Sequence, residues 1–496
     1  MTERTHARLD ASTRRRFLGA VGAAGIAATV PTAAVGDDGS TSVVDDELDV
    51  GTDELQEALV VFETADDVDR LAELDLAEGF LGFDRLPIGY AQLTGDQLLT
   101  VAGWDEVRRV APNRELECFN DDGRETTRAS EVQDGEGLNS AYTGENVHVA
   151  VIDTGVDGAH PDLEDNLAAN WQWVGNLEDE PDGVLWEDAE ALNTDDNGHG
   201  THCCGTVGGD GTESDGEYKG MAPEATLTSY SANVSLTLAT VVSAYDHLIE
   251  RKESGEADVQ IVSNSYGLAR SDDYDPWDPG NVATWYAFEA GILPVFAAGN
   301  DGPDRNTLNY YVRGPHVLGA AATDDEKAVV DFSSRGRGPD DDGETNADRE
   351  LALENHVDLY RGVPAEELGP VGIYRNGVGA KGADVMSTLN PAHPLQAYDV
   401  DDEVYYGLLS GTSMACPGVA GCAALVADAY YENHGAHLRP VDLLATIEAT
   451  AREDARDDYA AASIGAGFVD AHAAVERAEA GDVATLDEVE LAPRGG

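Results

Sequence analysis

The stretch VAVIDTGVDGAHPDL, residues 149–163, decides the fold. It opens with a short apolar run that suits a strand buried on both faces, and Asp153 ends this run directly before Thr154 and Gly155. Ligands of open parallel sheets sit beyond the carboxyl ends of the strands, so a carboxylate at this place is available for chemistry. An aspartate here also suits a turn or a helix cap, and the other motifs decide between these two interpretations.

Three more apolar runs share the character of this strand, with helical spacing between them. The runs are Val259–Ser263, Ile292–Ala297 and His316–Ala321, and apolar residues recur at helical intervals in Leu236–Lys252 and Val282–Ala290. Strands that alternate with helices predict an α/β fold, here a doubly wound and mostly parallel sheet covered by helices.

Two glycine-rich motifs supply further reactive side chains. NGHGTHCCGTV at 197–207 holds His199 between glycines, and GTSMACPGVAG at 411–421 places Ser413 at the expected start of a helix. At a helix start, the backbone N–H and the helix dipole favour a developing negative charge. A serine hydroxyl needs a base, an imidazole can take its proton, and a buried carboxylate can hold the imidazole in one tautomer. Ser413, His199 and Asp153 can fill these three roles.

The three motifs, in the order Asp, His, Ser, resemble those of the subtilisin-like serine proteases over roughly residues 125–480. The resemblance implies that Asp153, His199 and Ser413 are the catalytic triad and that Asn300, in FAAGN, stabilises the oxyanion. It implies that an extended polypeptide substrate binds at Ser265, Tyr266, Gly267, Ala297, Ala298 and Gly299. Asp162 matches a structural calcium ligand of many family members, with solvated surface acids as the alternative, and no catalytic cofactor is expected.

The resemblance also implies a domain organisation for the chain. Residues 55–117 look like the inhibitory propeptide of this family, a small ferredoxin-like α+β domain, although their own pattern reads β-α-β-α-β. A polar connector at 118–137, with the maturation site, leads to the subtilisin-like catalytic domain at 138–480. We expect an acidic linker at 37–54, an acidic and frayed tail at 481–496, and two insertions at 176–193 and 336–376.

The chain is strongly acidic, with 96 aspartates and glutamates against 30 lysines and arginines and a net charge of −66. Such a charge excludes a nucleic acid bound through a basic surface. The composition resembles that of proteins from extreme halophiles, so a halolysin-like protease is expected. Salt screens self-repulsion to about 3 Å at 1 M against about 10 Å at 0.1 M. We therefore predict a salt-requiring protein, with an ordinary acidic secreted protein as the alternative.

The N-terminus carries Arg14, Arg15 and Arg16 before the short apolar stretch Gly19–Val30. This pattern resembles a twin-arginine signal peptide, at 1–36, which exports a protein already folded; a buried N-terminal helix is the alternative. No interior run of eighteen apolar residues occurs, so no stable membrane association is expected.

Five cysteines, at positions 118, 203, 204, 416 and 422, cannot all pair within one chain. Buried thiols are the expectation, and a bridge between the two cysteine-bearing segments stays open.

These patterns together predict a secreted, salt-adapted serine endopeptidase, made as a self-processing zymogen with its own propeptide as inhibitor. One competing hypothesis is a catalytically inactive homologue that binds peptides, against which the four intact chemical positions argue. Another is a metal-dependent hydrolase that uses His199 and His202, although no second pair of spaced ligands accompanies them. Chelators would inhibit that hydrolase, whereas serine-directed fluorophosphonates would not.

Overall fold

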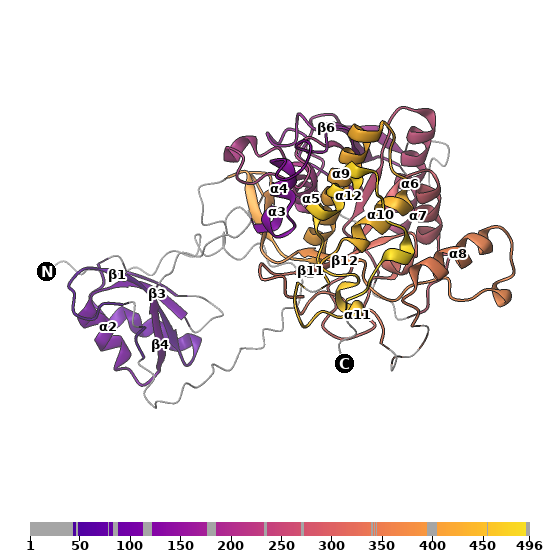
Figure 1. Cartoon of the computed structure of the whole chain (residues 1–496). Helices are drawn as coiled ribbons and strands as arrows, with labels where there is room; N and C mark the ends of the chain where they lie inside the picture. The colour runs from indigo at the N-terminus through magenta and orange to yellow at the C-terminus, as the bar shows by residue number, and fades with distance from the viewer. Residues whose placement is uncertain are drawn as a thin grey trace. The chain divides into compact units, whose positions relative to one another are not determined.

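The structure is a computed structural model that describes residues 43–492, apart from gaps at 46–47, 78, 83–87, 113–121, 176–184, 233–235, 269–271, 339–340, 342, 344, 394–403 and 454. The predicted signal peptide at 1–36 lies outside the described residues. The chain forms two compact units, Met1–Glu117 and Cys118–Gly496, which Figure 1 shows.

The smaller unit is a four-stranded antiparallel sheet in the order β2-β3-β1-β4. Its elements are β1 (Gln56–Phe62), the 3-10 helix η1 (Ala65–Glu73), β2 (Phe80–Gly82), β3 (Ile88–Leu93), α2 (Gly95–Ala102) and β4 (Val107–Pro112). The chain order is thus β-α-β-β-α-β when η1 counts as the first helix. The sequence pattern misses the short strand β2, so its second strand corresponds to β3.

The predicted linker at 37–54 differs in the structure. Val44 forms a bridge with Val110, Leu48 is buried in the core of the smaller unit, and Asp45 forms an ion pair with Arg109. Residues 37–42 lie outside the described part of the chain. A prediction from the acidic composition overlooks Val44 and Leu48, the two apolar side chains that attach this segment to the smaller unit.

The larger unit has an eight-stranded sheet in the order β12-β11-β10-β9-β5-β8-β6-β7. Its strands pair in parallel, except that β7 is antiparallel to β6. The strands are β5 (His148–Asp153), β6 (Leu167–Trp173), β7 (Trp186–Asp188), β8 (Thr226–Ser231), β9 (Ile261–Asn264), β10 (Leu293–Ala297), β11 (Leu318–Thr323) and β12 (Val378–Lys381). This architecture confirms the predicted mostly parallel α/β fold. A separate antiparallel pair consists of β13 (Val385–Thr388) and β14 (Tyr406–Leu409).

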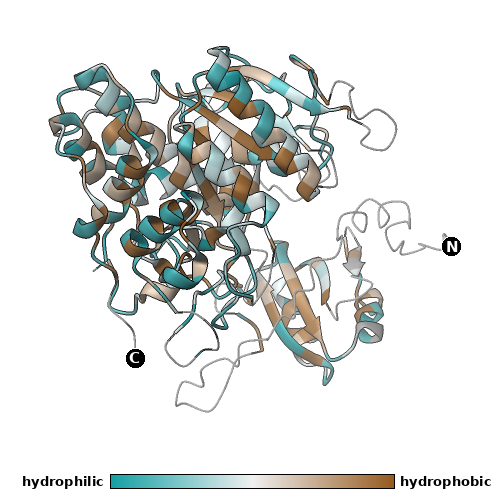
Figure 2. Cartoon of the chain, turned by 90° about the vertical axis from the view of Figure 1, so that its right-hand side faces the viewer, coloured by the Kyte–Doolittle hydropathy of each residue, from teal (hydrophilic) through white to brown (hydrophobic). Residues whose placement is uncertain are grey.

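Helices cover both faces of this sheet. Alternate residues of β5 divide between two cores, with Val149 and Val151 in one and Ala150 and Ile152 in the other. The first core includes residues of α5 (His199–Gly208), α9 (Thr412–His434), α10 (Pro440–Ala449) and α12 (Ala471–Ala480), and the second includes residues of α6 (Leu238–Ser254) and α7 (Pro279–Glu289). Figure 2 shows hydrophobic strands inside and hydrophilic residues on the outer helices.

Helix α9 is the central helix of the first core. Among the described residues it is the one helix long and apolar enough to cross a membrane by length and composition, but it is almost wholly buried inside the larger unit. Burial of this kind is typical of the core helix of a globular protein.

Two segments, which the sequence predicts as a polar connector and as a frayed tail, pack onto the larger unit instead. Residues of the predicted connector form α3 (Asp122–Thr126) and α4 (Ala129–Gln133), and Ala129 and Val132 are fully buried. In the predicted tail, Ala484 and Ala492 are buried, and the Ala492 N–H donates to the carbonyl of Gly465 at 3.0 Å. Small apolar side chains spaced along each segment explain the packing, because they fill gaps between the helices.

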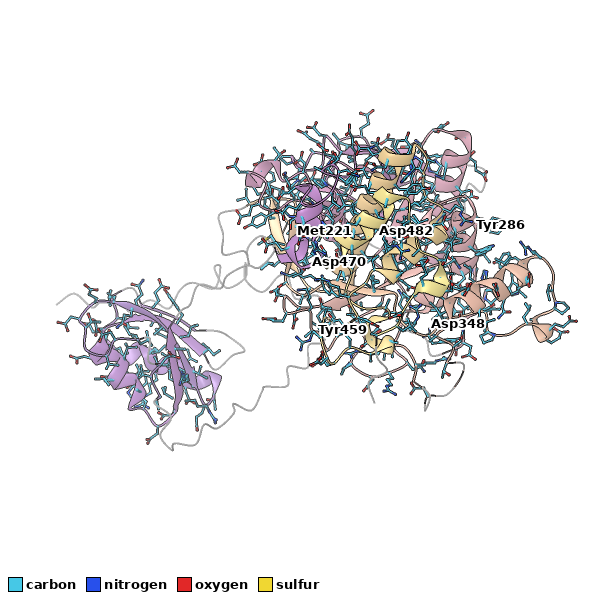
Figure 3. The ribbon with its side chains drawn as sticks, in the orientation of Figure 1. Met221, Tyr286, Asp348, Tyr459, Asp470 and Asp482 are labelled. Atoms are coloured by element: carbon cyan, nitrogen blue, oxygen red, sulfur yellow. The ribbon has the colours of Figure 1, made fainter. Side chains whose placement is uncertain are left out.

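The predicted insertion at 336–376 contains α8 (Arg349–Tyr360). Asp348, labelled in Figure 3, caps this helix by accepting a hydrogen bond from the Leu351 N–H at 3.0 Å. The buried carboxylate of Glu448, on α10, accepts hydrogen bonds from Arg349 and Arg375, so an ion network fixes the insertion to the sheet unit. The other predicted insertion, at 176–193, contributes β7, and its residues 176–184 lie outside the described part.

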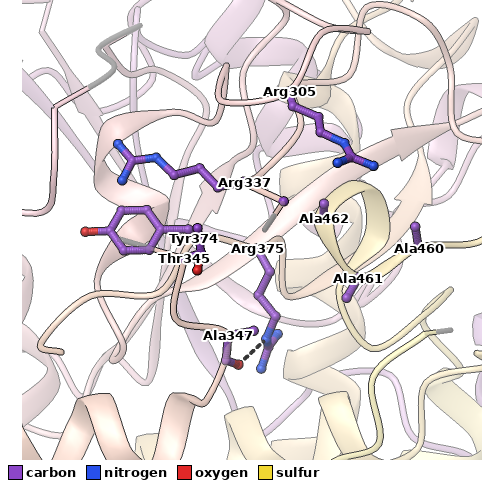
Figure 4. A pocket seen from close by; sticks show the side chains of 10 residues that line it. Arg305, Arg337, Thr345, Ala347, Tyr374, Arg375, Ala460, Ala461 and Ala462 are labelled. Atoms are coloured by element: carbon purple, nitrogen blue, oxygen red, sulfur yellow. Dashed lines mark hydrogen bonds between the residues drawn. The ribbon is translucent and has the colours of Figure 1, made fainter. Parts of the chain in front are cut away.

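A cavity of about 110 Å³ lies beside this network and is lined by Arg305, Arg337 and Arg375 (Figure 4). Two of these arginines are engaged with the protein: Arg375 Nε donates to the carbonyl of Ala347 at 3.0 Å, and the Arg337 guanidinium lies over the ring of Tyr374. The cavity is therefore part of the packing of the insertion.

Candidate active site

Asp153 and His199 form a hydrogen-bonded pair at the carboxyl edge of the sheet. Asp153 ends β5 with its side chain 1% exposed, and its Oδ1 lies 2.7 Å from His199 Nδ1. The same oxygen accepts the backbone N–H of Thr154 at 2.7 Å. A carboxylate can only accept a hydrogen bond, so the neutral imidazole must carry its proton on Nδ1. The other ring nitrogen, Nε2, is then free to act as a base.

Glycines allow this pair to form. His199 is the first residue of α5, and a Cβ on the next residue, Gly200, would lie 2.2 Å from the carbonyl oxygen of Gly155. Gly155 itself has a φ of 137°, and its added Cβ would lie 2.5 Å from the Thr194 carbonyl oxygen. The start of α5 can therefore approach the end of β5 backbone to backbone.

Ser413 lies in the first turn of α9, after the N-cap Gly411. Its hydroxyl donates to the carbonyl of Ser265 at 3.2 Å, and the Ser265 hydroxyl donates to the Ser413 carbonyl at 2.8 Å. The described residues contain no hydrogen bond between Ser413 and His199. Ser413 and His199 both lie close to Cys203, because the Cys203 Sγ is 3.9 Å from His199 Nδ1 and 3.5 Å from the Ser413 carbonyl oxygen.

The side chain of Asn300 is oriented by Thr412. The Thr412 N–H and hydroxyl both donate to Asn300 Oδ1, each at 2.9 Å. Because Oδ1 is used in this way, the amide nitrogen Nδ2 is the end left to donate toward the cavity that Asn300 lines beside Ser413. A donor held there suits an oxyanion that develops next to the serine.

A cavity of about 270 Å³ contains most of the predicted substrate-binding residues. It is lined by Ser265, Tyr266, Gly267, Leu268, Ala297, Gly299, Asn300, Asp301, Asn309, Thr412 and Ser413. Ala298 differs from the prediction, since it is fully buried and its N–H donates to the Ala320 carbonyl at 2.9 Å. In the described structure, the backbone N–H and carbonyl of Gly267 have no hydrogen-bond partner, so they are available to an extended chain.

Asn309 is a lining residue that the sequence analysis misses. Its Nδ2 donates to the carbonyls of Tyr266 at 3.0 Å and Ala297 at 2.7 Å, so one amide joins the two walls of the cavity. Gly267 makes room for it, because a Cβ there would lie 2.1 Å from Asn309 Oδ1. The sequence around Asn309 contains no motif that signals this role.

Electrostatics at the site favour a charged His199. Burial lowers the pKa of His199, but the Asp153 carboxylate raises it, and the pKa lies well above the ordinary 6.5. Burial raises the pKa of Cys203 to about 12, so this cysteine stays a neutral thiol.

His202 is not part of a metal pair with His199. It is fully buried, and its Nε2 contacts the carbonyl oxygens of Val385 at 2.8 Å and Gly407 at 3.1 Å. Burial lowers the pKa of His202 to about 4. Its role is to tie α5 to β13 and β14. Within the described residues, the group whose ligand atoms lie within 4.8 Å of one another consists of Asp153, His199 and Cys203.

Cys203, Cys204, Cys416 and Cys422 are buried free thiols. Cys118 lies outside the described residues. No bridge therefore joins the motif of α5 to that of α9, although the two helices pack together in the first core.

Two hydrogen bonds from the protein hold the carboxylate of Asp162. Its side chain is fully buried, Oδ1 accepts the Glu213 N–H at 3.0 Å, and Oδ2 accepts the Tyr406 hydroxyl at 2.6 Å. Each oxygen keeps a second lone pair, so calcium binding at Asp162 stays a prediction. These contacts give Asp162 a structural role in which it joins β14 to the loop after α5.

The sequence of this chain is similar to those of known proteins. The sequence pattern of the subtilase family matches residues 144–467. Serine protease AprX of Bacillus subtilis is 32% identical over 335 residues, which make up 64% of this chain and 65% of that protein. The major intracellular serine protease of Bacillus subtilis is 30% identical over 57% of this chain and 69% of its own length. The thermostable alkaline protease of Halalkalibacterium halodurans is 27% identical over 76% of this chain and 83% of its own length.

The fold has a counterpart among solved structures. Sphericase superimposes with a TM-score of 0.50 at 24% identity, over 69% of this chain and 96% of its own. The chain spans slightly less than two thirds of the length of AprX, so the comparison with that protein concerns a part of it. The family pattern covers well over half of this chain and includes Asp153, His199 and Ser413. The chain therefore belongs to the subtilase family.

Proposed function

We propose that this protein is a serine endopeptidase that hydrolyses peptide bonds through an acyl-enzyme. The observation that carries the proposal is the hydrogen bond between His199 and Asp153 beside a cavity that contains Ser413 and Asn300. Family membership supports the same chemistry, and the similar proteins whose names state an activity are proteases.

In the proposed mechanism, the Ser413 hydroxyl turns from the Ser265 carbonyl toward His199 Nε2 and attacks the peptide carbonyl. His199 takes the hydroxyl proton, and Asp153 stabilises the imidazolium that forms. The Ser413 N–H and Asn300 Nδ2 hold the oxyanion. His199 then gives the proton to the leaving amine, and water repeats these steps on the acyl-enzyme to release the acid.

The substrate binds as an extended chain. Gly267, with its free backbone groups, lies beside Ser265 on one wall, and Gly299 lies on the other. Pairing with a strand favours flexible or unfolded polypeptides, because a folded domain does not present its backbone in this way. The side chain before the scissile bond would enter the cavity, with Ala297 and Asn309 around it.

The smaller unit, with β1 to β4, acts in this proposal as the propeptide that inhibits the site until it is cut. The packing of α3 and α4 onto the larger unit favours a maturation cut before Asp122, because a cut inside either helix would break buried contacts. The arginine-rich N-terminus supports export by the twin-arginine route, and the net charge of −66 supports work at high salt.

The test uses wild type and Ser413→Ala, both produced as full chains in molar salt. We expect wild type to lose its smaller unit and to hydrolyse casein, and Ser413→Ala to do neither, because the nucleophile is absent. The measurements are the mass of the chain over time and the release of soluble peptides. Casein hydrolysis by the alanine variant would contradict the triad mechanism, and an inert wild type with a folded site would favour the peptide-binding homologue. Inhibition by a fluorophosphonate but not by a chelator distinguishes this mechanism from a metal hydrolase.

A further inference from the structure

The carboxylate of Asp195 is the most heavily hydrogen-bonded group around the candidate site. It is 4% exposed and accepts five hydrogen bonds. Its Oδ1 accepts the Thr154 hydroxyl at 2.8 Å, the Asn197 N–H at 3.1 Å and the Gly198 N–H at 2.9 Å. Its Oδ2 accepts the N–H and the hydroxyl of Thr201, each at 2.7 Å.

These bonds reach the neighbours of both members of the Asp–His pair. Thr154 directly follows Asp153, and Gly198 directly precedes His199. The Thr154 hydroxyl also accepts the Gly200 N–H at 2.9 Å, so the backbone is held on both sides of His199. Thr201 extends the connection, because its hydroxyl accepts the Asp157 N–H at 3.0 Å.

No ion pair involves Asp195 in the described part of the chain. Its buried charge is therefore compensated by N–H and O–H donors alone, which requires that all of them point inward together. Such a network holds a single arrangement, because a displaced donor would leave a buried charge without a partner.

We propose that Asp195 is a positioning residue for the proposed reaction: it holds the loop after β5 and the first turn of α5 in the register that keeps His199 on Asp153. This inference rests on the proposed function. Asp195 does not line the cavity beside Ser413, and its hydrogen bonds go to Thr154, Asn197, Gly198 and Thr201 and not to the triad. Its effect is on the geometry of the base, and displacements of about 1 Å at such a group can lower turnover about a hundredfold.

The chain offers a matched control in Asp428. This aspartate is 3% exposed and accepts hydrogen bonds from the N–H groups of Thr143, Gly144 and Asn146 and from the Asn146 side chain. It is thus a buried carboxylate bound by donors, but none of its hydrogen bonds involves the candidate site. Asp428→Asn measures what the loss of such a charge does to the fold in general.

A second pair of variants lies on α5. Thr201→Val removes the hydroxyl that bonds to Asp195, and Thr206→Val removes a buried hydroxyl that donates to the His202 carbonyl at 2.9 Å. The two substitutions are identical and share one helix. If circular dichroism shows that Asp195→Asn does not fold, the comparison of Thr201→Val with Thr206→Val tests the positioning role instead.

The experiment compares wild type and these variants in molar salt, after removal of the smaller unit and titration of active sites with a fluorophosphonate. We measure kcat and KM on a fluorogenic peptide that wild type cleaves, and the rate of fluorophosphonate labelling against pH. For Asp195→Asn, we expect kcat to fall about 10- to 100-fold with KM changed less than about threefold. For Thr201→Val, we expect a smaller fall in kcat of the same kind.

The pH profile separates positioning from general damage. The Asp153 carboxylate, 2.7 Å from His199 Nδ1, raises the pKa of His199. A looser contact with Asp153 should move the acid limb of the labelling rate to lower pH in Asp195→Asn, and Asp428→Asn should leave it in place.

If Asp195→Asn and Thr201→Val match their controls in kcat and in the acid limb, the positioning role is wrong while the proposed function stands. If wild type is inactive, or if Ser413→Ala hydrolyses the peptide, the proposed function fails and the inference fails with it.

Discussion

The Asp153 carboxylate raises the pKa of His199, and this has a consequence for the working pH. The base must be neutral to accept the Ser413 proton, so kcat/KM falls as the pH drops through the pKa of His199. Because that pKa lies well above 6.5, the loss of activity begins at a higher pH than for an ordinary histidine.

Asp153→Asn tests this directly. The substitution removes the negative charge that raises the pKa, so the acid limb of kcat/KM against pH should move toward lower pH. We expect kcat to fall about 10⁴-fold, as it does for the same change in a serine protease of another fold, because the amide favours the wrong tautomer. Asp358→Asn, an exposed aspartate on α8, serves as the control and should leave the limb unchanged. A limb that stays in place in Asp153→Asn would show that another group titrates.

Sequence motifs predict the positions of Asp153, His199 and Ser413, because each stands in a conspicuous setting of glycines and small residues. They do not predict that the Ser413 hydroxyl faces the Ser265 carbonyl, since that contact joins distant segments. They also overlook Asp195, which is one of 96 acidic residues in a sequence where aspartate carries little information. Only its burial and its five donors distinguish it.

At the scale of elements, the attachment of α8 depends on a buried network of three charges. Arg349 and Arg375 both bind the carboxylate of Glu448, and all three side chains are at most 3% exposed. Removing one member leaves the buried charges of the others without a full set of partners. The insertion should therefore lose its docking when Glu448 is neutralised.

We predict that Glu448→Gln lowers the free energy of unfolding by about 3 to 5 kcal/mol. The measurement is urea unfolding at constant molar salt, in a Ser413→Ala background that prevents self-digestion. Asp442→Asn is the matched control, because Asp442 is on the same helix, α10, and pairs with the exposed Arg439. A surface pair of this kind contributes about 0 to 1 kcal/mol. Equal losses in both variants would contradict a special role for the network.

The strands show where pattern reading fails. The sequence predicts β5, β9, β10 and β11 within a few residues, because each is a continuous apolar run. It misses β8, whose sequence TLTSYS looks polar. In the sheet, this strand lies between β5 and β6. The structure can bury it because Thr228 contacts His148 Nε2 at 2.7 Å and Ser231 donates to the Thr154 carbonyl at 3.0 Å. Such partners come from other segments, and no local pattern reveals them.

At the scale of the whole molecule, the net charge of −66 makes the stability of the folded state depend on the salt concentration. Acidic side chains that face water repel one another, and their repulsion falls as salt shortens the screening length. Pairing with 30 basic residues can compensate only a minority of the 96 acids. The folded state should thus gain stability as the salt concentration rises.

We predict that the melting temperature of Ser413→Ala rises by several degrees between 0.2 and 3 M NaCl, monitored by circular dichroism; these concentrations differ about fourfold in screening length. Sucrose at equal osmolality is the control, since it is excluded from protein surfaces but screens no charge. A melting temperature that stays constant or falls in NaCl would contradict salt adaptation. Equal effects of sucrose and salt would assign the gain to exclusion and not to screening.

Composition also misleads at this scale. It describes 37–54 as an acidic linker and 481–496 as an acidic tail, yet Val44 and Leu48 are buried in the smaller unit and Ala484 and Ala492 in the larger one. A few apolar side chains are enough to anchor a segment, and an average over fifteen residues does not detect them. The division at residue 117 is easier to predict, because a polar connector begins directly after it.

The place of Ser413 at the head of α9 also has a consequence in time. A ribosome makes the carboxylate of Asp153 and the imidazole of His199 early, together with Asp195 between them, but the nucleophile emerges only when most of the polypeptide has been translated. Products of premature termination before that point contain a base with nothing to activate. Incomplete chains that end before Ser413 therefore cannot hydrolyse proteins of the producing cell by the proposed mechanism.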